Sequence, residues 1–526
     1  MDAARKTDPS PQAPLVLCLL DGIGENEPSA GNAVRLAKTP YLDELGRKFA
    51  RTNLVASGEA VGLAADKPGS GALGSEAIGT GRVPRPAVME IDRVIANKKF
   101  AENKIIERTM WIVNDRKCRL HLFLPLGDAT AHSSMNHLHT LLRVCEANDV
   151  QVCVHVFLEE RASAPKSATR LLDSLLFTLE ERGTIGTISG ASFAMDRSGN
   201  WEATKQVYTA IVRGASEPKE TVHDALRAAY DKKRTDGTIE PVRIGEYEGI
   251  RGDYMADFAS DKLVWQWIGE EAGLFMFTRP DRARQLAAMF VRQNVPADVV
   301  EEFLTERGKP VRAFDEFGLL SLSEIDGQLE NVLTAFPRQT IEGTLAQAIS
   351  RAGLSGLRIS TAERAQHVGH FFDGGLPTRD PVTIVPEGGQ AGAVERALKE
   401  GSSAFVVVNF AGADQAARRG DLPAAIAAIE AIDTAVGTIA AATESAGGAL
   451  CIVGTHGAAE MMLDAEGKPR GLHTTNPTAF YYANPLDAES ALAADGRLED
   501  VAPTVLDILG IEKPDSMTGR SLRRAR

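Results

Sequence analysis

The 526-residue sequence is poor in cysteine, and the cysteines that it has are scattered. They are five in number, none belongs to a CxxC pair, and they occur at Cys18, Cys118, Cys145, Cys153 and Cys451. An odd, scattered set argues against a disulfide framework and against a cysteine metal site, and is typical of buried thiols in a reducing compartment. We therefore expect a cytoplasmic protein.

Long apolar runs and an excess of positive charge are also missing. The apolar run 15–20 is far shorter than the roughly 20 residues that cross a bilayer, and the polar start, 1–14, is unlike a signal sequence. The 58 Lys and Arg are outnumbered by 71 Asp and Glu, which gives a net charge of −13. This balance opposes binding to a nucleic-acid backbone. We expect a monomer that has neither a nucleic acid nor a membrane as a partner.

What the sequence does contain is a repeated pattern of short apolar segments that end in polar or glycine-rich tips. Three of them are 15–24, 403–414 and 449–457, and a helical pattern at 424–445 lies between the last two. Strands that alternate with helices predict an α/β fold, in which ligands gather at the carboxyl ends of the strands. Asp21, Asp414 and His456 stand at such ends.

A second set of strand-like segments lies in the middle of the chain, at 119–132, 150–161 and 184–190. A chain of this length exceeds one ordinary core, so two domains are expected. The short proline-containing segments 80–86 and 334–340 are suitable crossing points between the sets. We predict an outer domain formed by 1–86 and 336–526, with an inserted domain at 87–335.

The most informative motif is the glycine-rich segment 56–82, ASGEAVGLAADKPGSGALGSEAIGTGR. Backbone amides of such a loop before a helix can cradle an oxyanion or a phosphate. The segment resembles, without a gap, the nucleophile segment of the cofactor-independent phosphoglycerate mutases of the alkaline phosphatase superfamily. In that register the nucleophilic serine of the family falls on Gly71, which offers no nucleophile.

The resemblance covers nearly the whole chain, since 31–45, 154–168, 185–202, 277–290, 360–375 and 470–477 look like family segments in the family's order and spacing. It implies an α/β fold with an alkaline-phosphatase-like parallel-sheet domain that holds two Mn(II) ions, and an inserted transferase-like domain that grips the substrate. It also implies the family's glycolytic isomerisation of 3-phosphoglycerate to 2-phosphoglycerate through a phosphoserine.

The implied metal centre is incomplete in this sequence. The resemblance implies four retained ligands, namely Asp21, Asp414, His456 and His473. Arg418 stands where the family has a histidine and Thr455 where it has an aspartate, and Gly71 replaces the serine. A guanidinium ~4 Å from a divalent cation costs roughly 8 kcal/mol at an effective dielectric of 20, which equals the affinity of a micromolar site, about 8 kcal/mol. We expect Mn(II) or another divalent ion at one site, or none.

Two serines near the empty nucleophile position are alternatives. Ser70 is adjacent to Gly71, while Ser75 lies in a Ser-Glu pair similar to that of the family. Serines are also common in glycine-rich loops and at helix starts. We take Ser70 as the better catalytic candidate, together with Arg364, which stands where the family has a lysine and keeps the charge but not the capacity for proton transfer.

The anion-binding half of the resemblance is better preserved. It implies five substrate-binding residues, namely His132, Arg161, Arg197, Arg279 and Arg282. The last two stand three apart, so on a helix or tight turn they can fork one phosphate or carboxylate. Two further family positions are lost, at Ala162 and Ala191. We expect a cleft for a small phosphorylated or carboxylated metabolite with altered contacts.

Two functional hypotheses remain. The first is a divergent homologue that keeps the fold and the anion-binding cleft but lacks normal mutase activity, because nucleophile and metal ligands are replaced. The second is an active metal-dependent phosphotransferase or isomerase with a rearranged site or a different substrate. Structural roles also compete at single residues, since Asp21 could cap a turn and Asp414 could be a helix N-cap.

Overall fold

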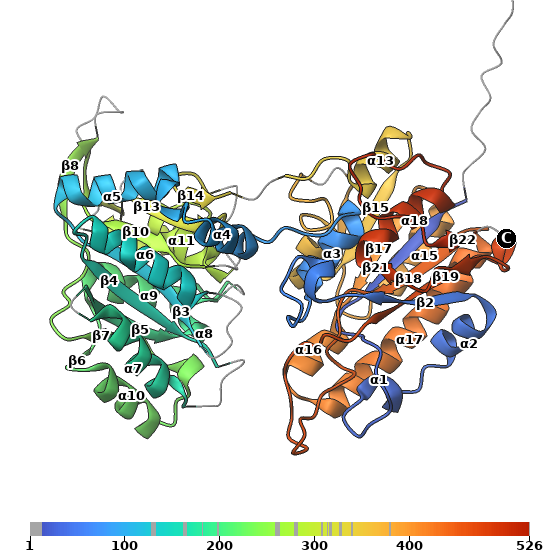
Figure 1. The fold of residues 1–526 in the computed structure, drawn as a ribbon, viewed down its shortest axis with the longest axis horizontal. Helices are drawn as coiled ribbons and strands as arrows, with labels where there is room; N and C mark the ends of the chain where they lie inside the picture. The colour runs from blue at the N-terminus through green and yellow to red at the C-terminus, as the bar shows by residue number, and fades with distance from the viewer. Residues whose placement is uncertain are drawn as a thin grey trace, which may run out of the picture. The chain divides into compact units, whose positions relative to one another are not determined.

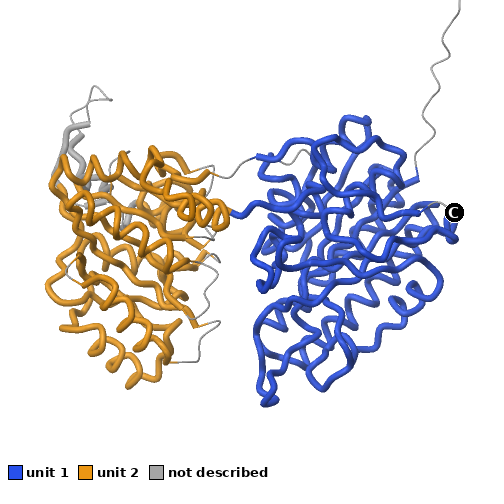
Figure 2. The backbone as a smooth tube through the Cα atoms, viewed as in Figure 1, with its two compact units in different colours: residues 1–86, 339–526 blue, residues 87–338 orange. Residues whose placement is uncertain are grey.

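The computed structural model describes residues 13–524 except for the short segments 128–132, 161–165, 181, 197–198, 258–263, 278–281, 304, 307–308, 313, 315–317, 326–328, 338–339 and 378–379. The chain divides into two compact units (Figure 2), of which unit 1 comprises residues 1–86 and 339–526 and unit 2 comprises residues 87–338. The sequence analysis placed these boundaries after residues 86 and 335.

Unit 1 is built on an eight-stranded sheet in the order β16-β15-β17-β1-β18-β19-β2-β21 (Figure 1). In that order the strands are Val382–Ile384, Gly356–Ser360, Phe405–Phe410, Leu15–Leu20, Ala449–Gly454, Thr478–Ala483, Ala50–Val55 and Gly496–Arg497. The central strand β1 pairs in parallel with both β17 and β18. β19 runs antiparallel to β18 and β2, because the described connection 455–477 has no crossover helix. The sheet is therefore mixed rather than wholly parallel.

Helices cover both faces of this sheet. One face carries α1 (Ala33–Leu36), α2 (Pro40–Lys48), α15 (Gln390–Glu400), α16 (Gly412–Arg418) and α17 (Leu422–Ser445), and the other carries α3 (Gly71–Thr80), α13 (Leu345–Arg351), α14 (Ala365–Val368) and α18 (Val501–Ile508). Val16, Cys18 and Leu20 of β1 pack toward the first set, and the alternate residues pack toward the second. A strand buried on both sides is the apolar run that a central parallel strand requires.

The helix α17 is, by length and composition alone, apolar enough to cross a membrane. The sequence analysis expected no such stretch, but the alanines of this helix form one. In the structure Ile429, Ile432 and Val436 pack into the core beside the sheet. The carboxylate of Asp433 accepts hydrogen bonds from the amides at the start of α2, including Leu42 N at 2.8 Å. We interpret α17 as a core helix of unit 1.

Unit 2 has its own eight-stranded sheet, in the order β14-β13-β10-β3-β4-β5-β7-β6. In that order the strands are Leu333–Phe336, Leu319–Ser323, Ala272–Phe275, Leu120–Leu126, Val152–Leu158, Gly183–Gly190, Val242–Ile244 and Pro218–Lys219. The three strands expected from the sequence are β3, β4 and β5, which pair in parallel. A four-stranded sheet, β11-β12-β9-β8, consists of Thr305–Glu306, Lys309–Arg312, Val264–Gly269 and Gly252–Asp257.

The helices of unit 2 form two layers. One face of the larger sheet carries α4 (Ala87–Ala96), α5 (Lys104–Arg116), α6 (Met135–Ala147), α7 (Ala168–Leu179) and α10 (Val222–Asp231). The other carries α8 (Ala191–Ala194), α9 (Trp201–Arg213), α11 (Arg284–Val291) and α12 (Ala297–Phe303). In unit 1 the short strands β20 (Ala491–Leu492) and β22 (Arg523–Arg524) form a separate pair. The α/β architecture predicted for both units is confirmed.

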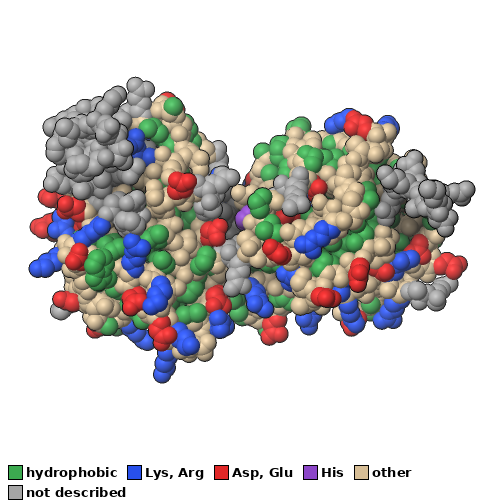
Figure 3. Space-filling view, turned by 90° about the horizontal axis from the view of Figure 1, so that it is seen from above, with side chains coloured by type: hydrophobic (Ala, Val, Ile, Leu, Met, Phe, Trp, Pro, Cys, Tyr) green, Lys and Arg blue, Asp and Glu red, His purple; other side chains and the backbone are tan. Residues whose placement is uncertain are grey.

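Charged side chains of both signs are interspersed on the described surface visible in Figure 3. Lys and Arg do not gather into one large patch on that face. A basic stripe is the usual electrostatic footprint of nucleic-acid binding. This face therefore adds nothing in favour of a nucleic-acid partner.

Candidate functional site

The candidate site of unit 1 lies where three neighbouring parallel strands end. Asp21 follows β1 directly, Asp414 lies in the first turn of α16 after β17, and Thr455 and His456 follow β18. The close approach depends on Gly22, whose φ is +75° and where a Cβ would lie 2.7 Å from the Cα of Asp414. The carboxyl ends of adjacent parallel strands meet at one edge of a sheet, the edge at which α/β proteins bind ligands.

Asp414 is the hub of this site, and its two carboxylate oxygens have different neighbours. Oδ2 accepts a 2.6 Å hydrogen bond from Nη2 of Arg364 and lies 3.1 Å from Nη2 of Arg418. Oδ1 lies 3.2 Å from Nε2 of His456 and 3.3 Å from Nε2 of His473. Burial alone would raise the pKa of Asp414, but the two imidazoles and the charge of Arg418 outweigh it and hold this pKa well below its usual range. Asp414 is the third residue of α16 and not its N-cap.

Hydrogen bonds assign the protons of the two imidazoles. Thr455 Oγ1 donates its only proton to Asp21 Oδ1 over 2.7 Å. In its 3.0 Å contact with Nδ1 of His456, Thr455 Oγ1 must therefore accept, and Nδ1 is the donor. Nδ1 of His473 donates to the carbonyl oxygen of Gly69 over 2.8 Å. With one proton each, on Nδ1, the imidazoles leave the Nε2 lone pairs for a metal ion; a second proton on Nε2 instead makes either imidazole a cationic donor to Asp414 Oδ1.

These three atoms fit one divalent ion. Asp414, His456 and His473 have ligand atoms that all lie within 4.8 Å of one another. Ligands bound tetrahedrally at 2.0–2.1 Å stand about 3.3 Å apart, and the contacts of 3.2 and 3.3 Å agree with that spacing. The outer N–H of each imidazole is held by Thr455 or by a backbone carbonyl, as metal-bound histidines require.

A second ion does not fit beside Asp21. Oδ1 of this buried carboxylate accepts a hydrogen bond from the hydroxyl of Thr455. Thr455 itself offers no carboxylate to an ion. Oδ2 lies 3.6 Å from Nη1 of Arg364, so a second ion would meet a guanidinium at a cost of roughly 8 kcal/mol for a 4 Å separation. Two guanidiniums also bind Asp414, but at Oδ2 rather than at Oδ1, where the imidazoles lie. The residues present therefore suit at most one ion, on the Oδ1 side, and not the pair that the resemblance implies.

The nucleophile position contains no side chain. Gly71 opens α3, and a Cβ there would lie 3.2 Å from Asp21 Oδ2 and 3.1 Å from Cδ2 of His367. Nε2 of His367 lies 3.3 Å from Nη1 of Arg364, and because a guanidinium only donates, this nitrogen is the acceptor. Sequence reasoning missed His367, although its spacing of three residues from Arg364 was a usable signal.

Both alternative serines belong to helix α3. Ser70 is the N-cap of α3, and its Oγ accepts from the amide of Leu73 over 3.4 Å. Ser75 is fully buried in the same helix. The interpretation of Ser70 as a helix start thus has direct geometric support.

Most of the substrate residues expected in unit 2 cannot be placed. His132, Arg161, Arg197 and Arg279 lie outside the described residues, as does Ala162. Arg282 is described and nearly buried, just before α11, and Ala191 opens α8. The predicted forking of one anion by Arg279 and Arg282 stays a prediction.

Unit 2 contains a buried polar chain that the sequence analysis did not anticipate. His121 Nε2 lies 2.9 Å from Glu271 Oε2, His121 Nδ1 lies 2.8 Å from His155 Nε2, and His155 Nδ1 lies 2.9 Å from Thr187 Oγ1. Arg119 and Arg251 also bind the Glu271 carboxylate. We call these groups, from Glu271 to Thr187, the histidine chain.

The histidine chain is closed by its own hydrogen bonds. Thr187 donates to His155, His155 to His121 and His121 to Glu271, so every donor meets an acceptor. Although His121, Cys153 and His155 also form a group of close ligand atoms, the 2.8 Å separation of two nitrogens is that of a hydrogen bond and is shorter than the about 3.3 Å of tetrahedral ligands. Burial lowers the pKa of both histidines, which keeps them neutral.

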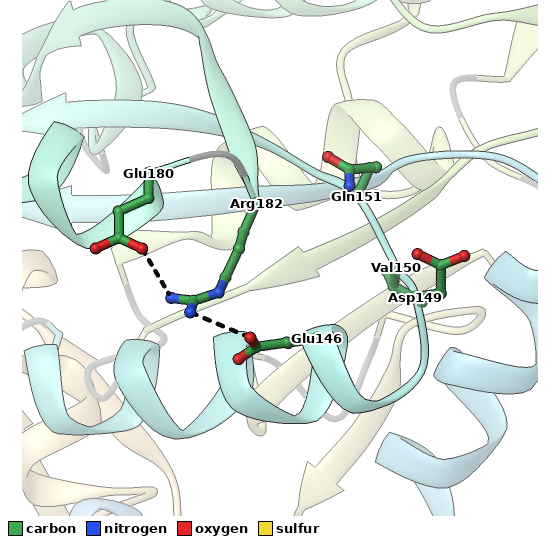
Figure 4. Close-up of a pocket in the computed structure, with 6 residues that line it drawn as sticks. All are labelled: Glu146, Asp149, Val150, Gln151, Glu180 and Arg182. Atoms are coloured by element: carbon green, nitrogen blue, oxygen red, sulfur yellow. Dashed lines mark hydrogen bonds and ion pairs between the residues drawn. The ribbon is translucent and has the colours of Figure 1, made fainter.

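A hollow of about 520 Å³ on unit 2 has none of the residues of the histidine chain in its lining. It is lined by Glu146, Asp149, Val150, Gln151, Glu180 and Arg182 (Figure 4). Arg182 lies between two carboxylates, 3.2 Å from Glu146 and 3.8 Å from Glu180. An acidic lining whose single arginine is already paired is unsuited to an anionic ligand.

Fold and site together define a two-domain α/β protein with a polar centre at the carboxyl ends of parallel strands. Residues 91–314 match the family described as BPG-independent PGAM N-terminus (iPGM_N). The chain is 33% identical over 530 residues to the 2,3-bisphosphoglycerate-independent phosphoglycerate mutase of Clostridioides difficile, covering 97% of this chain and 99% of that one.

Two further relatives agree with this assignment. The 2,3-bisphosphoglycerate-independent phosphoglycerate mutase 2 of Methanosarcina barkeri is 34% identical over 532 residues, 97% of this chain and 98% of its own. The solved Leishmania mexicana phosphoglycerate mutase, determined at low cobalt concentration, superposes with a TM-score of 0.83 over 99% of both chains at 23% identity. The chain belongs to the 2,3-bisphosphoglycerate-independent phosphoglycerate mutase family.

Proposed function

We propose that this protein is a divergent member of its family that binds a small phosphorylated or carboxylated metabolite and lacks the normal isomerisation of phosphoglycerate. The observation that carries the proposal is the absence of a side chain at Gly71, next to Asp21 Oδ2 and His367. The family reaction passes through a phosphoserine at this position. With no nucleophile there, that covalent step has no acceptor.

The surroundings of Gly71 support the same proposal. Asp21 is engaged by the Thr455 hydroxyl and the Arg364 guanidinium. Arg364 replaces the lysine of the family, and a guanidinium, unlike an amine, does not transfer protons in proteins. Three groups thus differ from the family's arrangement. The nucleophile is absent at Gly71, the carboxylate of Asp21 is already paired, and Arg364 cannot serve as a base.

Substrate binding is assigned by family position. We propose that His132, Arg161, Arg197, Arg279 and Arg282 of unit 2 bind the anion. Asp414, His456 and His473 would hold one divalent ion, which when bound supplies a Lewis acid for a phosphoryl or carboxylate oxygen. Residues Thr455 and Gly69 keep the two imidazoles oriented for that ion. The monomeric state and the cytoplasmic location remain predictions.

A coupled assay for conversion of 3-phosphoglycerate to 2-phosphoglycerate with added Mn(II) tests the proposal. We expect the natural protein to show no turnover near ordinary enzyme rates of about 10 s⁻¹. The quadruple variant Gly71→Ser, Arg364→Lys, Arg418→His and Thr455→Asp is expected to regain measurable turnover, because it restores the nucleophile, the lysine and both metal ligands. Ordinary turnover by the natural protein would contradict the proposal.

The second candidate function is a metal-dependent phosphotransferase with one ion and a different substrate. It is favoured by the convergence of Asp414, His456 and His473 on one point. Hydrolysis of a panel of phosphate esters, measured with Mn(II) and with EDTA, tests it. Activity that requires the ion and is lost in His473→Ala would establish this alternative, whereas His370→Ala, an exposed histidine of the same unit, is the control.

A further inference from the structure

We infer that Arg364 serves as the second cation of the centre in unit 1, with its guanidinium in the place that a second metal ion would otherwise take. The inference deepens the proposed function and rests on its one-ion site. It concerns how two buried carboxylates are neutralised, and therefore predicts behaviour of the protein that is independent of any substrate.

Arg364 makes one hydrogen bond to a carboxylate and lies at ion-pair distance from a second, whose Oδ2 has no hydrogen-bond partner among the described residues. Nη2 lies 2.6 Å from Asp414 Oδ2, and Nη1 lies 3.6 Å from Asp21 Oδ2 and 3.3 Å from Nε2 of His367. Two carboxylate oxygens and one imidazole nitrogen thus face the same planar group. Carboxylate oxygens and imidazole nitrogens are also the usual ligands of a divalent cation such as Mn(II) or Zn(II).

The position of Arg364 is determined by the backbone that carries it. The residue ends the short 3-10 helix Ala362–Arg364, which follows β15 at the carboxyl edge of the sheet. Its side chain is 6% exposed, against 23% for that of Arg418, the other guanidinium on Asp414. Arg364 is thus the more deeply buried of the two guanidiniums on Asp414.

The charge balance requires such a group. Asp21 and Asp414 are buried, and a buried carboxylate without a partner is strongly destabilising. A planar guanidinium can reach both carboxylates at once, whereas an ammonium group is a single point charge on a flexible stem. A lysine at 364 would therefore leave one carboxylate less well neutralised.

Arg358 offers a matched control in the same unit. It is fully buried, and Nη2 lies 3.0 Å from Asp373 Oδ1 and 3.0 Å from Asp380 Oδ2. Nη1 donates to the carbonyl oxygen of Val368, and the guanidinium lies 4.8 Å from the centroid of the Phe372 ring. Among the described residues, no histidine contributes to these contacts. The two arginines thus share burial and a pair of carboxylates but differ in the imidazole acceptor.

The experiment compares thermal unfolding of full-length Arg364→Met and Arg358→Met in EDTA and in Mn(II), with metal content measured by elemental analysis. In EDTA we expect both midpoints to fall by about 5–10 °C, because each variant removes a buried guanidinium from two carboxylates that are largely shielded from solvent. Mn(II) is expected to recover at least half of that fall in Arg364→Met, with one additional ion per chain, and little of it in Arg358→Met.

Failure of the inference is distinguishable from failure of the proposed function. An Arg364→Met protein that gains neither an ion nor stability from Mn(II) would overturn the inference alone. Two ions in the unmodified protein would overturn the one-ion site on which the proposed function relies. If Arg364→Met does not fold, Arg364→Lys, which keeps a charge, takes its place. For the inference to stand, its unfolding midpoint in EDTA must fall by less than that of Arg358→Met, and Mn(II) must recover part of the fall.

Discussion

The centre of unit 1 and the histidine chain of unit 2 contain the same kinds of residue in opposite arrangements. Each combines a buried carboxylate with two imidazoles. In the histidine chain, donors and acceptors alternate from Thr187 to Glu271. In unit 1, the Nε2 atoms of His456 and His473 both lie against one oxygen of Asp414, and because each Nδ1–H is already used, either a second proton on the imidazole or a metal ion must hold these atoms together. Only the second arrangement calls for a cation.

The two clusters also lie at opposite ends of their strands. His121 is the second residue of β3, and Glu271 precedes β10, so the histidine chain begins at the amino ends of its strands. Asp21 and His456 follow the carboxyl ends of theirs. Composition therefore does not distinguish a structural cluster from a functional one, but hydrogen-bond direction and the end of the sheet do.

The largest effect is expected from Glu271→Ala in the histidine chain. The change removes the common acceptor of His121, Arg119 and Arg251, and breaking a buried ion pair on one side costs about 3 kcal/mol. Amide hydrogen exchange in β3 and β4 at increasing urea measures the loss. A cost below about 1 kcal/mol would show that the chain is not closed in the way described.

A smaller effect is expected from His155→Phe, which removes one link of the chain. His121 Nδ1 loses its donor and Thr187 loses its acceptor, which costs about 2 kcal/mol through unsatisfied buried groups. The paired change in unit 1, His473→Phe, is expected to lower metal content rather than metal-free stability. Equal losses of metal-free stability in the two variants would contradict the contrast between the clusters.

Acid should weaken unit 2 through the same groups. Burial lowers the pKa of His121 and, with His121 and Arg119 nearby, that of His155. The unfolded chain binds protons at these histidines below about pH 6.5 while the folded one does not, so stability falls by up to about 1.4 kcal/mol per pH unit for each histidine. Urea unfolding between pH 7.5 and 5 measures this slope, which His155→Phe should reduce.

Glu271 adds to this acid sensitivity at lower pH. Burial alone would raise the pKa of this carboxyl, but hydrogen bonds from His121 and Arg119 outweigh it and lower the pKa. A carboxyl with a lowered folded pKa stabilises above its unfolded value, about 4.3, and that contribution is lost as the pH falls further. A stability profile that is flat from pH 7.5 to about 5 would contradict the assignment of the histidines, and one that is flat from about pH 5 to 2 would contradict that of Glu271.

Much of the fold could be predicted because the strands next to the sites are continuous apolar runs. The apolar parts of the segments 15–24, 403–414 and 449–457 form β1, β17 and β18, and their polar tips follow the strands. The reversal of β19 could not be predicted, because it depends on a connection without a helix rather than on the composition of the strand.

The site was less accessible from sequence because its chemistry depends on contacts between distant residues. The absence of a nucleophile at Gly71 and the replacement at Thr455 are visible in the sequence, since they are losses of a side chain or a charge. The bridging of Asp21 and Asp414 by Arg364 is not, because it requires three segments to meet. The histidine chain was missed for the same reason.

The smallest effect is expected from Ser70→Ala, at the edge of the centre in unit 1. Its hydroxyl caps α3, so loss of the cap should cost about 1 kcal/mol. The change should leave any phosphorylation of the protein by a phosphate ester unaltered. Loss of a phosphoserine in this variant, detected by mass spectrometry, would instead make Ser70 the nucleophile.

The central claim is that the centre of unit 1 has one metal position and one guanidinium in place of the other. Anomalous X-ray scattering from a crystal of the protein equilibrated with Mn(II) tests this claim most directly. The account predicts one peak, bounded by Asp414, His456 and His473, with Arg364 between Asp414 and Asp21. A second peak beside Asp21, with Arg364 displaced, would contradict it.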